Sequence, residues 1–285
     1  MNKPLIIVCA TLLPLLFAVP VRAAENFSVN ADIGYVADDN VTKAEASDDI
    51  FEDSFITGSG GFTYKQELSF RSLLLYRGSV AFESYDEFDG LSNVALNGTI
   101  DYKIQLARGF GAAAYTLTAF VQEHDFESDM RDSTTLGVRG TVAKRFTDRI
   151  FSTFGLGYKK RESESDVFDT ESARIFGNLD WLLTDQLVSY ATLQYVVGDV
   201  VSTARPTLDI INAAQAIEPD DAFGGVQTGR FAYKLSADTA LLTLGLNYGI
   251  NRANSLDASV ELLSSDADAI QYERAVIRLS YLVVF

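Results

Sequence analysis

Charged and amide side chains recur at every second position of segments whose remaining positions are apolar. In the segment 93–105, Asn97 and Asp101 alternate with Leu96 and Ile100. An extended chain points successive side chains to opposite sides, so such a segment has one polar and one apolar face. Charged groups on one face can pair with each other or line a passage for ions and small solutes. The predicted inward-facing, pore-lining residues are Arg71, Arg77, Asp101, Lys103, Arg139, Lys159, Arg174, Asp180, Asp257, Glu261 and Arg278.

Catalytic and metal-binding patterns have little support in this chain. It holds one histidine, His124, with Ser128 four residues on. A serine nucleophile needs a base within hydrogen-bond reach and a third group to orient that base, and nothing nearby marks such a set. The carboxylate-rich loops lack the ordered ligand spacing of a calcium loop. We therefore expect no enzyme activity, metal or cofactor, with a lipid-modifying enzyme dependent on His124 as the alternative.

Apolar and polar residues alternate in twelve segments, which predicts twelve β-strands. Most of these segments run for roughly ten to fifteen residues, whereas strands of soluble proteins average five or six. A tilted strand needs about 9–11 residues to cross a bilayer. The predicted strands are residues 26–37, 54–64, 68–82, 93–105, 110–122, 134–144, 150–159, 172–183, 187–198, 237–250, 255–263 and 271–285. The expected fold is all-β, a transmembrane antiparallel up-and-down β-barrel of 12 strands.

The connections between these segments alternate in length, as they do in transmembrane barrels with short inner turns and longer outer loops. Both chain ends are then expected on the side of the short turns. The predicted short turns are residues 65–67, 106–109, 145–149, 184–186 and 251–254. The predicted longer, acidic loops are residues 38–53, 83–92, 123–133, 160–171, 199–236 and 264–270.

The longest loop, 199–236, leaves two points open. Its end, 229–236, alternates like a strand and would bring the count to thirteen. Because bacterial single-chain barrels have even strand numbers, we assign 229–236 as an outer extension of the strand 237–250, with the apolar face switching near Ala237. Its middle, 208–217, has apolar residues at near-helical spacing. We interpret it as a short helix that constricts the mouth, or else as part of a mobile outer loop.

The start of the chain has the organisation of a secretory signal peptide. One lysine precedes an apolar stretch at 5–19, and small residues at 21 and 23 precede the expected cleavage site. The stretch is shorter than the ~20 residues of a membrane-spanning helix, and Pro14 interrupts it. We expect a signal peptide, 1–23, and one barrel domain, 24–285, that contains no cysteine. The formal net charge of −16 argues against nucleic acid as a partner.

The last nine residues, IRLSYLVVF, form a two-faced segment that ends on an aromatic residue. With Tyr281 and Phe285 at matching positions, this ending resembles the assembly signal of Gram-negative outer-membrane β-barrel proteins. The resemblance identifies a class and no single family. It implies export through the periplasm, recognition by the barrel-assembly machinery, integral localisation in the bacterial outer membrane, and contact with outer-membrane lipid and lipopolysaccharide.

Two interpretations of the inward-facing charges remain open. In the first, the barrel is a porin through which small hydrophilic solutes diffuse passively, with a preference for anionic ones, because seven of the eleven residues are basic. In the second, ion pairs close the barrel, and its acidic loops serve adhesion, envelope integrity or assembly of a surface polymer. Twelve strands leave more interior space than the eight that side chains can just fill. We therefore expect the channel, with the closed barrel as the alternative.

Overall fold

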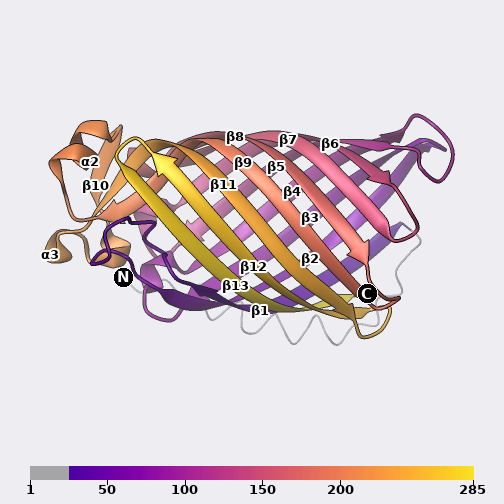
Figure 1. Cartoon of the computed structure of the whole chain (residues 1–285), viewed down its shortest axis with the longest axis horizontal. Coiled ribbons are helices and arrows are strands. Elements are labelled where there is room, and N and C mark those ends of the chain that lie inside the picture. The colour runs from indigo at the N-terminus through magenta and orange to yellow at the C-terminus, as the bar shows by residue number, and fades with distance from the viewer. Residues whose placement is uncertain (1–25) are drawn as a thin grey trace.

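The computed structural model describes residues 26–285, and the expected signal peptide, 1–23, lies outside this range. The strands are β1 (Phe27–Asp38), β2 (Asp53–Ser69), β3 (Ser72–Tyr85), β4 (Asn93–Gln105), β5 (Ala114–Phe126), β6 (Ser133–Arg145), β7 (Ile150–Ser163), β8 (Thr170–Leu182), β9 (Leu187–Ala204), β10 (Ala216–Pro219), β11 (Phe231–Gly249), β12 (Asn254–Ala267) and β13 (Ile270–Val284). All but the short β10 form a closed barrel of twelve antiparallel strands (Figure 1). The predicted fold class is confirmed.

Closure of the barrel gives every long strand two neighbours. β13 pairs with β1 along nine residue pairs, and β11 pairs with β9. A free strand edge in hydrocarbon would leave backbone N–H and C=O groups without partners, at several kcal/mol each. The N–H of Phe285 donates to the carbonyl of Val29 over 2.8 Å, which joins the last residue to the first strand. Among residues 26–285, no helix is long and apolar enough to cross a membrane.

The two faces of the wall differ in polarity, as the alternation predicted. Leu96 and Leu156 point outward and are 55% and 67% exposed, which suits contact with lipid tails. Asp101 and Thr118 point inward and are buried, with the Thr118 hydroxyl donating to the Asp101 carboxylate over 2.6 Å. The barrel thus turns its apolar face outward, the reverse of a soluble barrel.

Several predicted boundaries were wrong. The second strand continues through the expected turn 65–67, and the chain reverses instead at Phe70 and Arg71. β5 begins at Ala114 rather than at residue 110, and most strands extend further outward than predicted. Alternation depends on a lipid face, so it weakens where strands project beyond the bilayer.

The assignment of 229–236 to the following strand is confirmed, with β11 beginning at Phe231. Tyr233 and Leu235 are fully buried and share the inward face of Thr239, while the lipid-facing leucines of β11 lie at the other parity. The backbone therefore runs straight while the apolar residues change face. The short strand β10, which pairs with the outer part of β11, was not predicted.

The main hydrophobic core lies at the outer end of the barrel. Tyr233 and Leu235 pack there with Ala44 of the loop after β1, Tyr272 of β13 and Ile210. Ile210 belongs to α2 (Leu208–Ala213), the short helix that the spacing predicted, whose first turn is capped by the side chain of Thr207. In Figure 1, α2, β10 and α3 (Gly225–Thr228) gather at the end opposite to the C-terminus.

Candidate functional site

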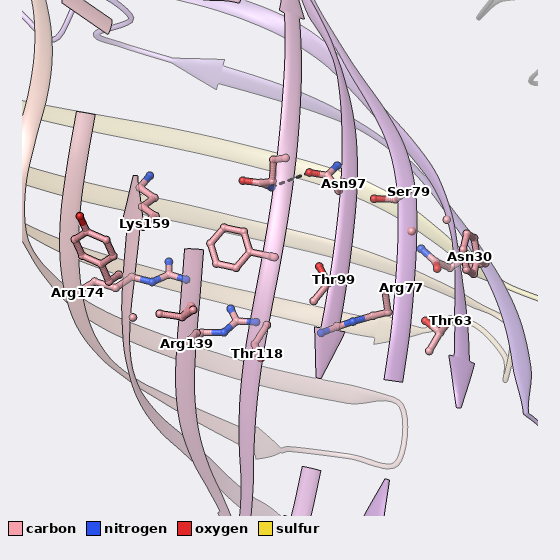
Figure 2. Close-up of a pocket in the computed structure, with 18 of the residues that line it drawn as sticks. Asn30, Thr63, Arg77, Ser79, Asn97, Thr99, Thr118, Arg139, Lys159 and Arg174 are labelled. Atoms are coloured by element: carbon pink, nitrogen blue, oxygen red, sulfur yellow. Dashed lines mark hydrogen bonds between the residues drawn. The ribbon is translucent and has the colours of Figure 1, made fainter. Parts of the chain in front are cut away.

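The inward faces of β1 to β8 enclose a cavity of about 470 Å³. Basic side chains, amides and hydroxyl groups point into it from successive strands (Figure 2). Among them, the amide of Gln122 donates to that of Asn97 over 2.8 Å. The cavity brings together four of the predicted lining residues, Arg77, Arg139, Lys159 and Arg174.

One of these cations is neutralised within the wall. The Arg77 guanidinium forms an ion pair with Asp101, and the same carboxylate accepts the hydrogen bond from Thr118. An arginine and a carboxylate that pair in this way are mutually stabilised and contribute little net field. Arg77 therefore belongs to the structural network that one interpretation of the sequence expected.

The other three, Arg139, Lys159 and Arg174, which we call the cavity cations, have no such partner. Within residues 26–285, neither Arg139, Lys159 nor Arg174 forms an ion pair with a carboxylate. Arg139 and Arg174 approach each other across Gly157 of the intervening strand: a Cβ placed there would lie 3.4 Å from the Arg174 Nε and 3.6 Å from the Arg139 Cβ. Charges held without partners in a polar cavity require water or counter-ions, so this wall of the lumen is strongly electropositive.

Acidic side chains lie on the far side of the barrel. Asp257 of β12 accepts hydrogen bonds from the Tyr190 hydroxyl over 2.9 Å and from the Asn247 amide over 3.3 Å. Glu261, on the same strand face, accepts from the Thr243 hydroxyl over 3.4 Å. The order of the strands places β12 across the lumen from β5 and β6. These two acids therefore lie apart from the cations of β6 to β8, and Arg278 of the neighbouring strand β13 shares the lumen face beside them.

The remaining predicted residues are dispersed. Lys103 shares the strand face of Asp101, Asp180 that of Arg174, and Arg278 that of the buried Ser280. None of these three lines the cavity. Arg71 was expected within a strand, and this was wrong. It lies in the exposed turn between β2 and β3 and donates to the carbonyl of Leu106 over 3.3 Å.

A second group of cations, not predicted from the sequence, lies at the outer end of the lumen. We call Lys43, Arg131 and Arg161 the vestibule cations. Arg161 lies on the same face of β7 as Lys159, and a correctly placed end of that strand would have revealed it. Lys43 and Arg131 lie in outer loops, where no periodicity marks a direction. Burial and then the charges of Arg274 and Arg131 lower the pKa of Lys43 to about 7.

His124 is not arranged for serine catalysis. Its ring stacks on Phe126 at 5.7 Å between ring centroids. The Ser128 hydroxyl donates its hydrogen bond to Asp221. A base and nucleophile in a hydrolase would face each other, whereas Ser128 bonds to Asp221 and the Nδ1 atom of His124 is buried without a hydrogen-bond partner among residues 26–285.

No protein-family model and no curated protein sequence matches this chain. Among solved structures, the COG4313 outer membrane channel from Pseudomonas putida F1 has a TM-score of 0.59 at 14% identity, covering 94% of this chain and 97% of that one. The KdgM porin in complex with disordered oligogalacturonate has a TM-score of 0.45 at 8% identity, covering 90% of this chain and 99% of that one. At these identities the likeness concerns the fold. The chain has the fold of an outer-membrane β-barrel.

Proposed function

We propose that the protein is an outer-membrane channel for passive diffusion of small hydrophilic solutes, with a preference for anionic ones. The observation that carries this proposal is the group of three cations, Arg139, Lys159 and Arg174, that share a cavity without carboxylate partners. Such residues lower the electrostatic barrier to an anion and raise it for a cation. The Pseudomonas putida structure with this fold is described as a channel, which agrees with the proposal.

The proposal places the barrel in the outer membrane, which it would reach through the periplasm with the help of the barrel-assembly machinery. Its lipid-facing wall supports this location. The exposed side chains of that wall are predominantly leucine, isoleucine, valine and aromatic residues. Outer-membrane lipid and lipopolysaccharide would surround it, and small polar solutes would be its transient ligands.

Ion selectivity in planar bilayers tests the proposal. We expect single-channel openings of the purified protein to favour chloride over potassium in a salt gradient. Replacing Arg139 and Arg174 by alanine should lower the permeability ratio about two- to fivefold, which corresponds to about 0.4–1 kcal/mol in the barrier. Arg149→Ala is the matched control, because Arg149 is exposed in the turn after β6.

The outcomes separate the candidate functions. Openings with no anion preference, or an equal ratio in the double variant and in Arg149→Ala, would refute the role of the cavity cations. Folded protein that never conducts, even after removal of the segment that covers its mouth, would favour the closed barrel whose acidic loops serve adhesion, envelope integrity or surface-polymer assembly.

A further inference from the structure

Residues 205–230, which we call the cap, cross the outer mouth of the barrel and pack there against the loop 39–52, with Ile210 against Ala44 and Phe223 against Phe51. The cap joins β9 to β11 and contains α2, β10, α3 and the 3₁₀ turn Asp221–Phe223. Phe223 at its tip packs against Phe88 of the loop between β3 and β4, with 4.8 Å between ring centroids. Strands β3 and β4 stand across the lumen from β9 and β11. The cap therefore spans the opening from one wall to the other.

The tip of the cap is acidic, and its acids contact the loops it reaches. Asp221 accepts a hydrogen bond from the Ser128 hydroxyl of the loop between β5 and β6. Glu218 accepts one over 2.7 Å from the Ser165 hydroxyl of the loop between β7 and β8. The tip is thus attached to two loops through side-chain oxygens of its own acids.

Asp220, between them, is the most enclosed of the three. Its side chain has no exposed surface, and it accepts two hydrogen bonds from Arg131, over 2.8 and 2.6 Å. The Thr203 hydroxyl donates a third, over 2.5 Å. The Arg131 guanidinium is itself held over the ring of Phe168, at 4.3 Å from the centroid. A buried carboxylate that accepts three hydrogen bonds from two donor groups marks a preorganised anion site, here occupied by a carboxylate of the chain itself.

Two more cations lie beside this site, and the carboxylates that act on them are Asp38, which is itself paired with Arg274, and Asp169. Lys43 and Arg161 lie close enough to Arg131 for their charges to interact. Arg161 hydrogen bonds to the Ser133 hydroxyl over 2.9 Å and to the Arg131 carbonyl over 2.8 Å, and neither partner is a carboxylate. Lys159, which is one of the cavity cations, lies two residues further inward on the same face of β7. An anion that enters from outside meets the vestibule cations first.

We infer that the vestibule cations form an outer binding site for the acidic group of the solute, which Asp220 of the cap occupies in the closed barrel. This inference rests on the proposed channel function. The carboxylate of the solute displaces that of Asp220 from Arg131, the cap loses its buried anchor, and the mouth opens. The ligand class is a small hydrophilic carboxylate that carries hydroxyl groups able to meet the amides and hydroxyls of the cavity.

The mechanism satisfies the condition for any ligand-driven opening. A ligand shifts a conformational equilibrium only if it binds the two states with different affinities. The Arg131 Nη2 group that holds Asp220 cannot hold a solute carboxylate in the same position, so the solute binds the open state more tightly than the closed one. Opening and binding then increase each other.

Single-channel recording with gluconate, and with sorbitol as its uncharged counterpart, tests the inference. Gluconate on the outer side should raise the open fraction of the wild-type channel in a saturable way, whereas sorbitol should not. Asp220→Asn should raise the open fraction about tenfold or more without any ligand, because it removes the charge from a buried ion pair. Asp209→Asn, an exposed acid of the same cap, is the matched control and should behave as wild type.

A cysteine pair tests whether the cap must move. The predicted barrel domain, residues 24–285, has no cysteine of its own, so Ser128→Cys with Asp221→Cys can join the cap tip to the opposite loop. We expect the oxidised pair to stay closed in gluconate and to reopen after reduction. Equal openings in both redox states would overturn the inference.

A third variant separates this inference from the channel function. Deleting residues 208–228 should leave a barrel that conducts constantly, with correct folding verified by its heat-modifiable migration in gels. If this variant is silent, the channel function itself fails. If it conducts while Asp220→Asn matches wild type and gluconate has no effect, the channel function stands and the inference on Asp220 is wrong.

Discussion

At the scale of single residues, some charged side chains of this barrel form ion pairs and others do not. Arg77 has Asp101, Arg274 has Asp38, and Arg131 has Asp220, each in a hydrogen-bonded ion pair. The cavity cations lack carboxylates within the described residues. The ion pairs stabilise the wall and the cap, and the cations without a carboxylate partner are available to bind solutes.

Lys43 provides a prediction on pH. Its pKa, lowered to about 7 by burial and by the charges of Arg274, Arg131 and Arg161, with Asp38 acting in the opposite direction, makes it positive below neutral pH and uncharged above. Anion preference should therefore fall as the pH rises from about 6 to about 8.5. Lys43 has its ordinary pKa of 10.5 in the unfolded chain and a pKa of about 7 in the folded protein. Between these values the unfolded chain binds more protons, so the free energy of unfolding rises as the pH rises from about 7 to about 10.5.

Reversal potentials across that pH range measure the effect. In Lys43→Gln the anion preference should match that of the wild type at pH 8.5 and be almost independent of pH. The substitution keeps an unbranched side chain at a position whose φ of 54° is already unusual for a residue with a Cβ. A pH dependence as steep in the variant as in wild type would assign the titration to another group.

At the scale of the strand, β4 carries the second prediction. Leu96 faces lipid, and its neighbour Asn97 lines the cavity. An arginine that faces lipid costs about 2–4 kcal/mol near the bilayer midplane, whereas one in a polar lumen remains hydrated. Leu96 pairs with Glu123 near the outer end of β4, whereas Ile100, further inward on the same face, pairs with Tyr76 and Ala119. Ile100→Arg should therefore reduce the yield of folded barrel in lipid vesicles far more than Thr99→Arg, on the cavity face, measured by heat-modifiable migration. Equal yields would mean that the faces of β4 are reversed.

At the scale of the whole molecule, the outer core connects the barrel to its cap. Leu235 is fully buried there, whereas Leu246 of the same strand is 48% exposed to lipid. Shortening a buried leucine to alanine removes about 2–5 kcal/mol of packing free energy. We expect Leu235→Ala to loosen the cap while the barrel remains closed by its strand pairing.

Limited trypsin digestion from outside reports this loosening. Cleavage after Arg230, the last residue of the cap, which contacts Asp49, should be faster in Leu235→Ala than in wild type, whereas the bond after Arg205 resists trypsin because Pro206 follows it. Leu246→Ala should digest as wild type does. Cleavage within the strands of Leu235→Ala would show that the core supports the barrel itself and not only the cap.

The sequence by itself determined the wall of this protein. Alternation in segments such as 93–105 marked the strands and placed Leu96 outside and Asn97 inside. This works because an extended backbone has a period of two and lipid penalises every polar residue on the wrong face. Even the continuation of β11 through 231–236 could be argued from the alternation and the even strand number.

Only the tertiary structure decided which charged residues form ion pairs and how the outer mouth is covered. Nothing local distinguishes Arg77, which meets Asp101 on the neighbouring strand, from Arg139, which meets no acid in the described chain. Asp220 and Arg131 lie 89 residues apart in separate loops. Beyond the bilayer no lipid imposes a period, so contacts between loops depend on how the closed barrel brings its strand ends together across the lumen.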